Sequence, residues 1–296
     1  MPAVAPYLPL SMSREQIIAF TPEWEGERCE DGRPRVPDTI IERMRLVTVT
    51  EAWMAMNNRE YSFQYAGGWE RVNPDEVLCG RALTAVYMPK RPNLHEVIFA
   101  RAREAGQVGD QVSWPIDALS PGDVYVADCM GRVLDGPVIG DNLATAIMVK
   151  SGNGVVHHCA IRDVEGVREV PGFTAFTRGV HPSYASRNVT IMGINCPIRI
   201  DDAMVFPGDV VLGKVDGVIF IPAHLAEKIC TISEIIRVRD IFGKVRIREG
   251  KYLPGEIDRK WEDHIEKDFS AWLAEGHADL PVPPETIADF LSGRTW

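Results

Sequence analysis

Short runs of β-branched and aromatic residues, bounded by Gly, Pro, Asp and Asn, dominate the middle of this 296-residue chain. Such runs are typical of β-strands, because branched and aromatic side chains pack well on a pleated surface. Apolar residues at helical spacing lie between some of these runs. We expect helices over 94–104 and 142–151, and strands over 83–88, 123–128, 154–161, 174–177, 189–194, 196–200, 209–213 and 217–222.

The order of these elements does not follow a uniform β-α-β repeat. Several strands of the second half succeed one another through short turns, at Pro207–Asp209 and Val215–Gly217. This favours an α/β fold with strand layers and helices packed on one side. We predict an N-terminal extension at 1–75, an α/β core at 76–222 and a helical C-terminal extension at 223–296.

Both flanking zones contain helical patterns. Ser13 can cap a short helix, and Asp38 precedes the helical run TIIERMRLV as a second cap. The aromatic segment EYSFQYAGGWERVNP, which follows both, predicts a packed loop, with a lid over a pocket as the alternative. The segments 223–242 and 257–275 carry apolar stripes, and Val282–Glu285 precedes a last short helix. We expect these C-terminal arms to pack on neighbouring subunits rather than to do chemistry.

Charge and cysteine content narrow the functional class. The net charge of −10 argues against a nucleic-acid partner, which requires clustered Lys and Arg. The six cysteines contain no C-x-x-C pair, so we expect reduced, mostly buried thiols. No apolar run reaches the roughly 18–20 residues that span a bilayer, and the N-terminus lacks the features of a signal peptide. We therefore expect a cytoplasmic protein with no membrane partner.

The most informative motif is the turn Gly140-Asp141-Asn142-Leu143-Ala144. Gly140 permits tight backbone geometry, and Asp141 is a suitable helix N-cap. The N–H groups of Asn142, Leu143 and Ala144 would then face outward at the positive end of the helix dipole, where a carboxylate or phosphate binds. Asp141 acting only as a cap is the alternative.

A second motif, Arg162-Asp163, follows the expected strand at 154–161. Polar residues at the end of such a strand lie at the edge of the sheet, where α/β proteins place ligands. Arg162 can hold a carboxylate with two hydrogen bonds, and Asp163 can offer an oxygen to Mg²⁺. A surface salt bridge between the two residues is the alternative.

Four pieces in order resemble the RraA-like family, which includes 4-hydroxy-4-methyl-2-oxoglutarate aldolases. They are PGDVYVAD, GDNLATAIMVKSGNGVV, AIRDV and PGDVVLGKVDGVIFIP, within 121–222. The resemblance implies a layered β/β/α core and a homotrimer, or a homohexamer of two trimers, with active sites between subunits. It does not extend over the first 75 or the last 50 residues.

The resemblance also implies roles for the two motifs. The backbone amides of Asn142, Leu143 and Ala144, together with Arg162, would bind the pyruvyl end of a substrate. Asp163 would ligate Mg²⁺ or Mn²⁺, and Asp141 would contact a water held by the metal. A carboxylate from a neighbouring subunit is expected as well, with Glu234 and Asp240 as candidates.

The chain departs from the family pattern just before Arg162. His158-Cys159 stands where the family usually has Asp-Gly, and His157 precedes it. Strand alternation predicts that one histidine faces inward and the other outward. Structural histidines are one interpretation, and His158 as a catalytic base or substrate contact is the other. Lys90, Arg91 and His95, in a second divergent region, either face a substrate or belong to a solvated loop.

The sequence thus predicts a divalent-metal-dependent aldolase that cleaves a 4-hydroxy-2-oxo acid to pyruvate, with oxaloacetate decarboxylation as a side reaction. A cation and fixed donors would stabilise the negative charge of the enolate. One alternative is a metal-dependent lyase or hydratase acting on a sugar-acid derivative. Another is a regulator that binds a ribonuclease, and a third is a metal-free ligand-binding protein.

Overall fold

The computed structural model describes residues 11–57, 60–275, 280 and 282. It divides into two compact units, Met1–Ala226 and Glu227–Trp296. Within the described residues, no helix combines the length and the apolar character needed to cross a bilayer. The helix predicted after Val282–Glu285 lies outside the described residues.

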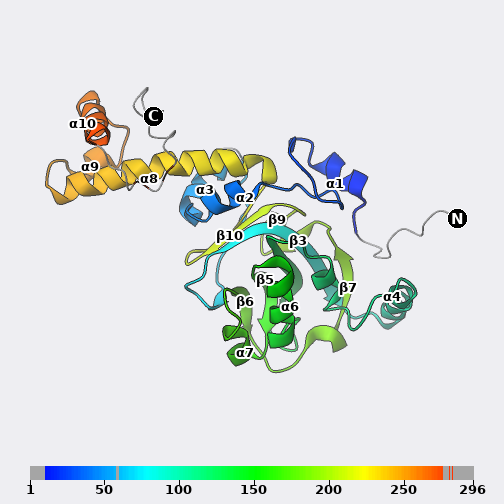
Figure 1. The fold of residues 1–296 in the computed structure, drawn as a ribbon. Helices are drawn as coiled ribbons and strands as arrows, with labels where there is room; N and C mark the ends of the chain where they lie inside the picture. The colour runs from blue at the N-terminus through cyan, green and yellow to red at the C-terminus, as the bar shows by residue number, and fades with distance from the viewer. Residues whose placement is uncertain (1–10, 58–59, 276–279, 281, 283–296) are drawn as a thin grey trace. The chain divides into compact units, whose positions relative to one another are not determined.

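A nine-stranded mixed sheet organises the first unit (Figure 1). Its path is β1-β11-β10-β3-β4-β5-β6-β2, and β7 pairs with β3. The central strands β3 to β6 are parallel, whereas their neighbours are antiparallel. The strands are β1 Tyr65–Ala66, β2 Glu70–Val72, β3 Leu78–Pro89, β4 Asp123–Arg132, β5 Val155–Ile161, β6 Ala175–Val180, β7 Val189–Ile194, β10 Val210–Lys214 and β11 Gly217–Ile221.

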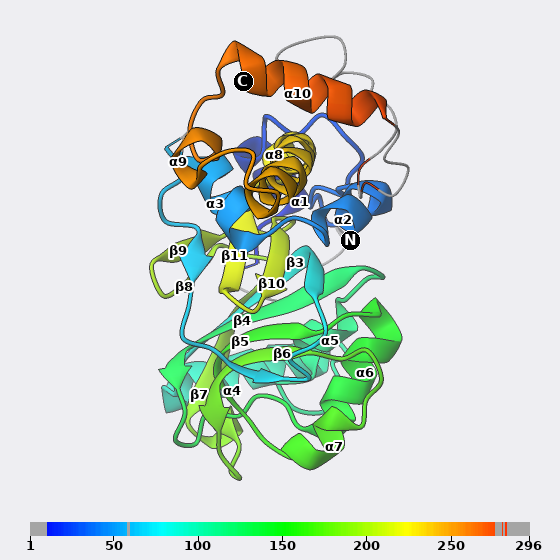
Figure 2. The same ribbon diagram turned by 90° about the vertical axis from the view of Figure 1, so that its left-hand side faces the viewer.

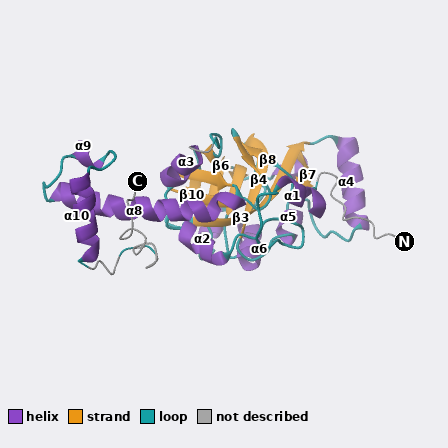
Figure 3. Ribbon diagram, turned by 90° about the horizontal axis from the view of Figure 1, so that it is seen from above, coloured by secondary structure: helices purple, strands orange, loops and turns teal. Residues whose placement is uncertain are grey.

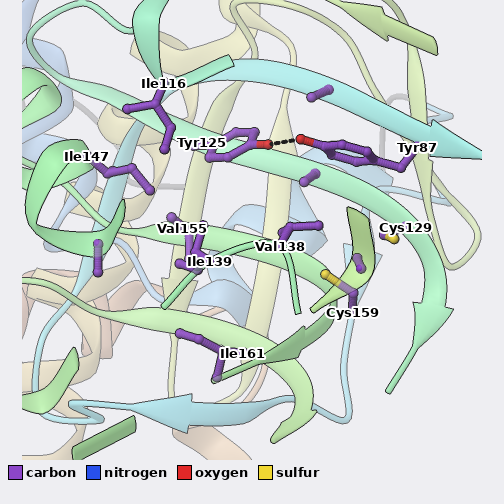
Figure 4. Packing of buried hydrophobic residues seen from close by; sticks show 14 of the residues in the cluster. Tyr87, Ile116, Tyr125, Cys129, Val138, Ile139, Ile147, Val155, Cys159 and Ile161 are labelled. Carbon is purple, nitrogen blue, oxygen red and sulfur yellow. Dashed lines mark hydrogen bonds between the residues drawn. The ribbon is translucent and has the colours of Figure 1, made fainter. Parts of the chain in front are cut away.

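Helices cover one face of this sheet. They are α4 Pro92–Glu104, α5 Trp114–Asp117, α6 Asp141–Ser151 and α7 Val164–Arg168, and each places apolar residues in one buried cluster with the strands. Figure 2 shows α6 and α7 alongside β5 and β6. Inside the same cluster, the hydroxyl groups of Tyr87 and Tyr125 form a hydrogen bond of 3.0 Å (Figure 4).

A short hairpin covers the opposite face. It consists of β8 Ile198–Ile200 and β9 Ala203–Val205, whose apolar side chains pack with Val124, Val126 and Val156. The order of layers is therefore hairpin, sheet and helices. Figure 3 shows the strands together, with α5 and α6 beside them. The predicted layered β/β/α fold is confirmed.

The expected strands and helices of the core are all present. β3 and β4 extend beyond the predicted 83–88 and 123–128. The Val215–Gly217 turn joins β10 to β11, with Lys214 opposite Gly217. Strand β9 and helix α7 were not predicted, because three- and five-residue elements carry too few positions for a periodic pattern.

The N-terminal segment forms three helices, α1 Arg14–Phe20, α2 Asp38–Met44 and α3 Val49–Asn57. Ser13 caps α1 in a capping box with Gln16, as expected. The predicted cap at Asp38 is wrong, because Pro37 occupies the N-cap position and the Asp38 carboxylate pairs with Arg81 at 2.8 Å.

The aromatic segment near residue 65 is part of the sheet rather than a loop. Strand β1 pairs with β11, and β2 pairs with β6. The Trp69 ring packs against the apolar cluster on the hairpin side of the sheet. The division at residue 76 stays a prediction about organisation, although the sheet itself begins at Tyr65.

The second unit is helical. It contains most of α8 (Ala226–Arg248), with α9 Pro254–Ile257 and α10 Asp263–Ala274. Helix α10 begins six residues later than the predicted 257. Phe242, Trp261, Phe269 and Trp272 form an aromatic core, and Arg246 binds Asp268 through two hydrogen bonds.

Both histidines of β5 are buried, at 1% and 8% exposure, because layers cover both faces of the sheet. Strand alternation places the two rings on opposite faces of the sheet, as predicted, but neither face is open to solvent. The His157 ring meets Tyr125 edge-on at 4.6 Å, and neither ring nitrogen has a hydrogen-bond partner among the described residues. Burial lowers the pKa of His157 to about 3, so the ring stays neutral in the folded protein.

We expect His157→Phe to weaken the pH dependence of stability. The unfolded chain protonates His157 below its ordinary value of 6.5, whereas the folded protein does so only near pH 3. Stability is therefore lost as the pH falls through 6.5, by about 1.4 kcal/mol between pH 7.5 and 5.5. Urea unfolding of wild type and variant at both pH values measures this difference.

The variant must be compared with the wild type, because Asp209 changes stability with pH in the opposite direction. Burial raises the pKa of Asp209 to about 7, so this carboxyl group makes the protein less stable as the pH rises. Val155→Ala is the matched control, since Val155 is a buried, non-titrating neighbour in the same cluster. It should lower stability equally at both pH values. A His157→Phe profile parallel to that of the wild type would contradict the prediction.

Candidate active site

The loops that follow β4, β5 and β6 meet at one edge of the sheet, because the three strands are parallel. Backbone hydrogen bonds tie these loops together. The Arg162 N–H donates to the Ile139 carbonyl at 3.2 Å, and the Ala185 N–H donates to the Pro137 carbonyl at 2.8 Å. The positions of the two predicted motifs are thus fixed by main-chain contacts rather than by their side chains.

A cavity of about 300 Å³ lies at this edge. Its wall contains residues from each of the three loops and from the loop that precedes α5. They are Pro137–Gly140 and Leu143 after β4, Arg162 after β5, Tyr184 and Ser186 after β6, and Asp110 and Val112 before α5. The volume is at the small end of the range for ligand sites, about 300–1,000 Å³.

The start of α6 differs from the prediction by one residue. Gly140 is the N-cap, and Asp141 is the first helical residue, so the predicted cap at Asp141 is wrong. The Asp141 carboxylate accepts the Asn142 N–H at 2.7 Å, and the buried Ala144 donates its N–H to the Gly140 carbonyl at 2.9 Å. Of the three predicted amides, only that of Leu143 has no partner within the described part of the chain.

Arg162 and Asp163 stand beside Gly140. The guanidinium of Arg162 is 42% exposed and lies 3.4 Å from the Asp163 carboxylate. A Cβ atom on Gly140 would collide with Asp163 Oδ2 and would lie 3.2 Å from Arg162 Nε. The glycine therefore allows both side chains to approach the start of α6, which brings the two predicted motifs together.

The carboxylates of Asp141 and Asp163 suit a divalent cation in part. Asp163 approaches Gly140, and Asp141 Oδ2 would lie 2.9 Å from a Cβ on Gly166 in α7, so both lie near the α6–α7 junction. Mg²⁺ commonly binds one or two carboxylates and retains several waters. Across the described residues no group of three or more His, Cys, Asp or Glu side chains could hold a metal. The donors fit an open, hydrated site rather than an all-protein cage.

His158 lies on the other face of the sheet, in a polar network next to the hairpin. Its Nδ1 is 3.0 Å from Asp128 and its Nε2 is 3.1 Å from Asp201. Asp201 also pairs with Arg178, whose guanidinium stacks 3.8 Å from the centre of the Trp69 ring. The structure does not bring His158 to the cavity that Arg162 lines.

The other divergent residues do not line the cavity either. His95 Nδ1 is 3.0 Å from the Thr190 hydroxyl, and Lys90 and Arg91 are exposed. Sequence reasoning missed Asp110, Tyr184 and Ser186, which do line it. No local pattern marks them, because their position depends on contacts between segments about 75 residues apart in the sequence.

We expect His158→Leu to lower the free energy of unfolding by about 1–3 kcal/mol, because Asp128 and Asp201 would lose a shared partner. Urea unfolding measures the loss. In a double-mutant cycle with Asp128→Asn, the two losses should be less than additive. His264→Gln, at an exposed position of the second unit, is the control and should change stability by less than about 0.5 kcal/mol. Wild-type stability in His158→Leu would rule out this structural role.

Known proteins share both sequence and fold with this chain. A 4-hydroxy-4-methyl-2-oxoglutarate aldolase of Thermus thermophilus is 30% identical over 140 residues, which are 44% of this chain and 83% of the aldolase. Protein DlpA of Legionella pneumophila is 24% identical over 232 residues, which are 76% of this chain. The match spans only 35% of the length of DlpA.

The crystal structure of Streptomyces coelicolor RraAS2, an unusual member of the RNase ES inhibitor RraA protein family, superposes with a TM-score of 0.62. The match is 24% identical and covers 72% of this chain and 100% of RraAS2, which supports the fold. The pattern of the RraA-like family (Aldolase/RraA) matches residues 46–220, more than half of the chain. The resemblance seen in the sequence is confirmed, and the chain belongs to the RraA-like family.

Proposed function

We propose that this protein is a lyase that cleaves a 4-hydroxy-2-oxo acid to release pyruvate, with Mg²⁺ or Mn²⁺ as its cofactor. The observation that carries the proposal is the meeting of Arg162 with the start of α6 at one cavity. A guanidinium and a helix N-terminus both favour a carboxylate ligand. The aldolase name of the Thermus thermophilus relative supports the same reaction class.

Arg162 would bind the carboxylate of the 2-oxo acid, which fixes the orientation of the carbonyl beside it. Leu143 lines the same cavity, and its N–H has no acceptor among the described residues, so it would donate a further hydrogen bond. Asp163 lies next to Arg162, and its carboxylate balances the positive charge of the guanidinium when no substrate is bound.

Asp163 and Asp141 would hold the divalent cation. They adjoin the lining residues Arg162 and Gly140 rather than line the cavity themselves. When bound, the cation supplies a Lewis acid that stabilises the negative charge developing on the 2-oxo oxygen. As the bond between C3 and C4 breaks, the 4-hydroxyl group loses its proton and C4 becomes a carbonyl carbon. The electron pair of the broken bond forms the enolate of pyruvate, and a proton added at C3 then gives pyruvate. His158 does not line the cavity, so this geometry favours another group as the proton acceptor.

We expect pyruvate release to require both a divalent cation and the Arg162-Asp163 pair. Arg162→Ala and Asp163→Asn should each lower kcat/KM by roughly a hundredfold or more, because each removes a charged partner of the reacting end. A coupled assay of pyruvate from 4-hydroxy-2-oxo acids and oxaloacetate, with Mg²⁺, Mn²⁺ or EDTA, measures the effect.

The matched controls are Arg168→Ala and Glu165→Gln, which alter exposed residues of the neighbouring helix α7. Both should retain wild-type activity. Pyruvate release that persists in EDTA, or in both site variants, would refute the proposed site. Folded, cation-loaded protein that releases no pyruvate from any of these acids would refute the proposed reaction.

Gly140→Ala should weaken both cation binding and activity at least tenfold. The backbone at Gly140, with φ −131° and ψ −163°, is extended and accessible to alanine, so crowding of Asp163 is the cause. Titration with Mn²⁺ followed by electron paramagnetic resonance gives the affinity. Gly255→Ala, where a Cβ meets nothing within 4 Å, is the control. If Gly140→Ala binds Mn²⁺ with unchanged affinity, Asp163 is not a ligand of the cation.

A further inference from the structure

The wall of the cavity carries two side chains of opposite charge, from different loops. Arg162 follows β5, whereas Asp110 belongs to the loop before α5. Among the described residues that line the cavity, these are the only charged side chains. The remaining lining is apolar or hydroxylated, with Leu143, Tyr184 and Ser186.

Asp110 is exposed, but two hydrogen bonds hold its carboxylate in place. Its Oδ1 accepts the Ser186 hydroxyl at 2.8 Å and the Val112 N–H at 3.3 Å. Its Oδ2 has no hydrogen-bond donor in the described part of the chain, so one carboxylate oxygen is free to accept from a ligand. The Ser186 contact also fastens the loop before α5 to the loop after β6.

Among the described residues, Arg162 is the only basic side chain that lines the cavity. Burial lowers the pKa of His95, whose ring interacts with the charge of Asp110, and Lys90 lowers it further, so the ring is mainly neutral at pH 7. Arg187 stacks 5.0 Å from the centre of the Tyr184 ring and does not line the cavity. A second carboxylate on the ligand would therefore meet Asp110 without a counter-charge.

We propose that Asp110 is a specificity-determining residue that selects 4-hydroxy-2-oxo acids with a neutral, hydroxyl-bearing tail and rejects those with a second carboxylate. This inference rests on the proposed function for the position of the first carboxylate, at Arg162. The cavity of about 300 Å³ is small, so a short acid bound at Arg162 extends toward the remaining walls, where Asp110 lies. Asp110 accepts a hydrogen bond from a hydroxyl group and repels a carboxylate.

Three five-carbon acids that differ only at C5 test the selection. They are 4-hydroxy-2-oxopentanoate with a methyl group, 4,5-dihydroxy-2-oxopentanoate with a hydroxymethyl group, and 4-hydroxy-2-oxopentanedioate with a carboxylate. We expect kcat/KM to be highest for the hydroxymethyl compound and at least tenfold lower for the dicarboxylate. In Asp110→Asn, the ratio of dicarboxylate to hydroxymethyl kcat/KM should rise at least tenfold.

Asp117→Asn is the matched control, because Asp117 is an exposed carboxylate beside Lys150 and does not line the cavity. Its substrate ratio should equal that of the wild type. An Asp110→Asn variant that loses activity equally on all three acids would overturn the inference and would instead mark Asp110 as a proton acceptor. A wild-type preference for the dicarboxylate that is lost in Arg187→Ala would also overturn it.

Binding of unreactive acids separates this inference from the proposed reaction. Calorimetry with 2-oxopentanoate and 2-oxopentanedioate in the presence of Mg²⁺ gives the ratio of their Kd values without turnover. We expect the monocarboxylate to bind more tightly to the wild type, and Asp110→Asn to shift the ratio at least tenfold toward the dicarboxylate. If no acid releases pyruvate, the proposed reaction fails, and this Kd ratio alone decides the role of Asp110.

Discussion

The parallel pairing of β4, β5 and β6 is the constraint on which the candidate site depends. Parallel strands place their carboxyl ends at one edge, so the segments that leave them meet even though they are distant in sequence. Main-chain hydrogen bonds from Arg162 and Ala185 then join these segments into one wall. A slip of one residue in β5 would exchange the faces of His157 and His158 and shift Arg162 relative to the loop after β4. The buried cores on both faces disfavour such a slip.

The sequence predicts the parts of the site that are built by local chemistry. Gly140 before an acidic residue indicates a turn into a helix, and Arg162 after an apolar run indicates the end of a buried strand. Both expectations agree with the structure to within a residue. The error at Asp141 has the same origin as that at Asp38, since an aspartate is favourable both at the N-cap and in the first turn, and the pattern alone does not separate the two positions.

The rest of the site depends on contacts that no local pattern encodes. Asp110 reaches the cavity because Ser186 fastens its loop, and Gln111 beside it is buried against the backbone of β7 through Val189 and Ile191. A polar loop in the sequence thus becomes one wall of the cavity. The histidine pair allows two interpretations in the sequence, and the three-dimensional contacts favour the structural one. Unusual polar residues beside an arginine suggest catalysis, yet the layers on both faces enclose His157 in an apolar core and His158 in a network of carboxylates.

The charge of the whole protein and the charge of the cavity have different consequences. A net charge of −10 repels anionic ligands at long range, but salt screens that field beyond about 8–10 Å. Inside the cavity, the carboxylate of a ligand is assigned to Arg162 in the proposed function, and the other end of the ligand is placed at Asp110 in the further inference. A cavity of about 300 Å³ with two side chains of opposite charge suits a short ligand that has one anionic end and one end that donates hydrogen bonds. The parallel strands fix where the cavity lies, and the loop before α5 adds the carboxylate of Asp110 to its lining.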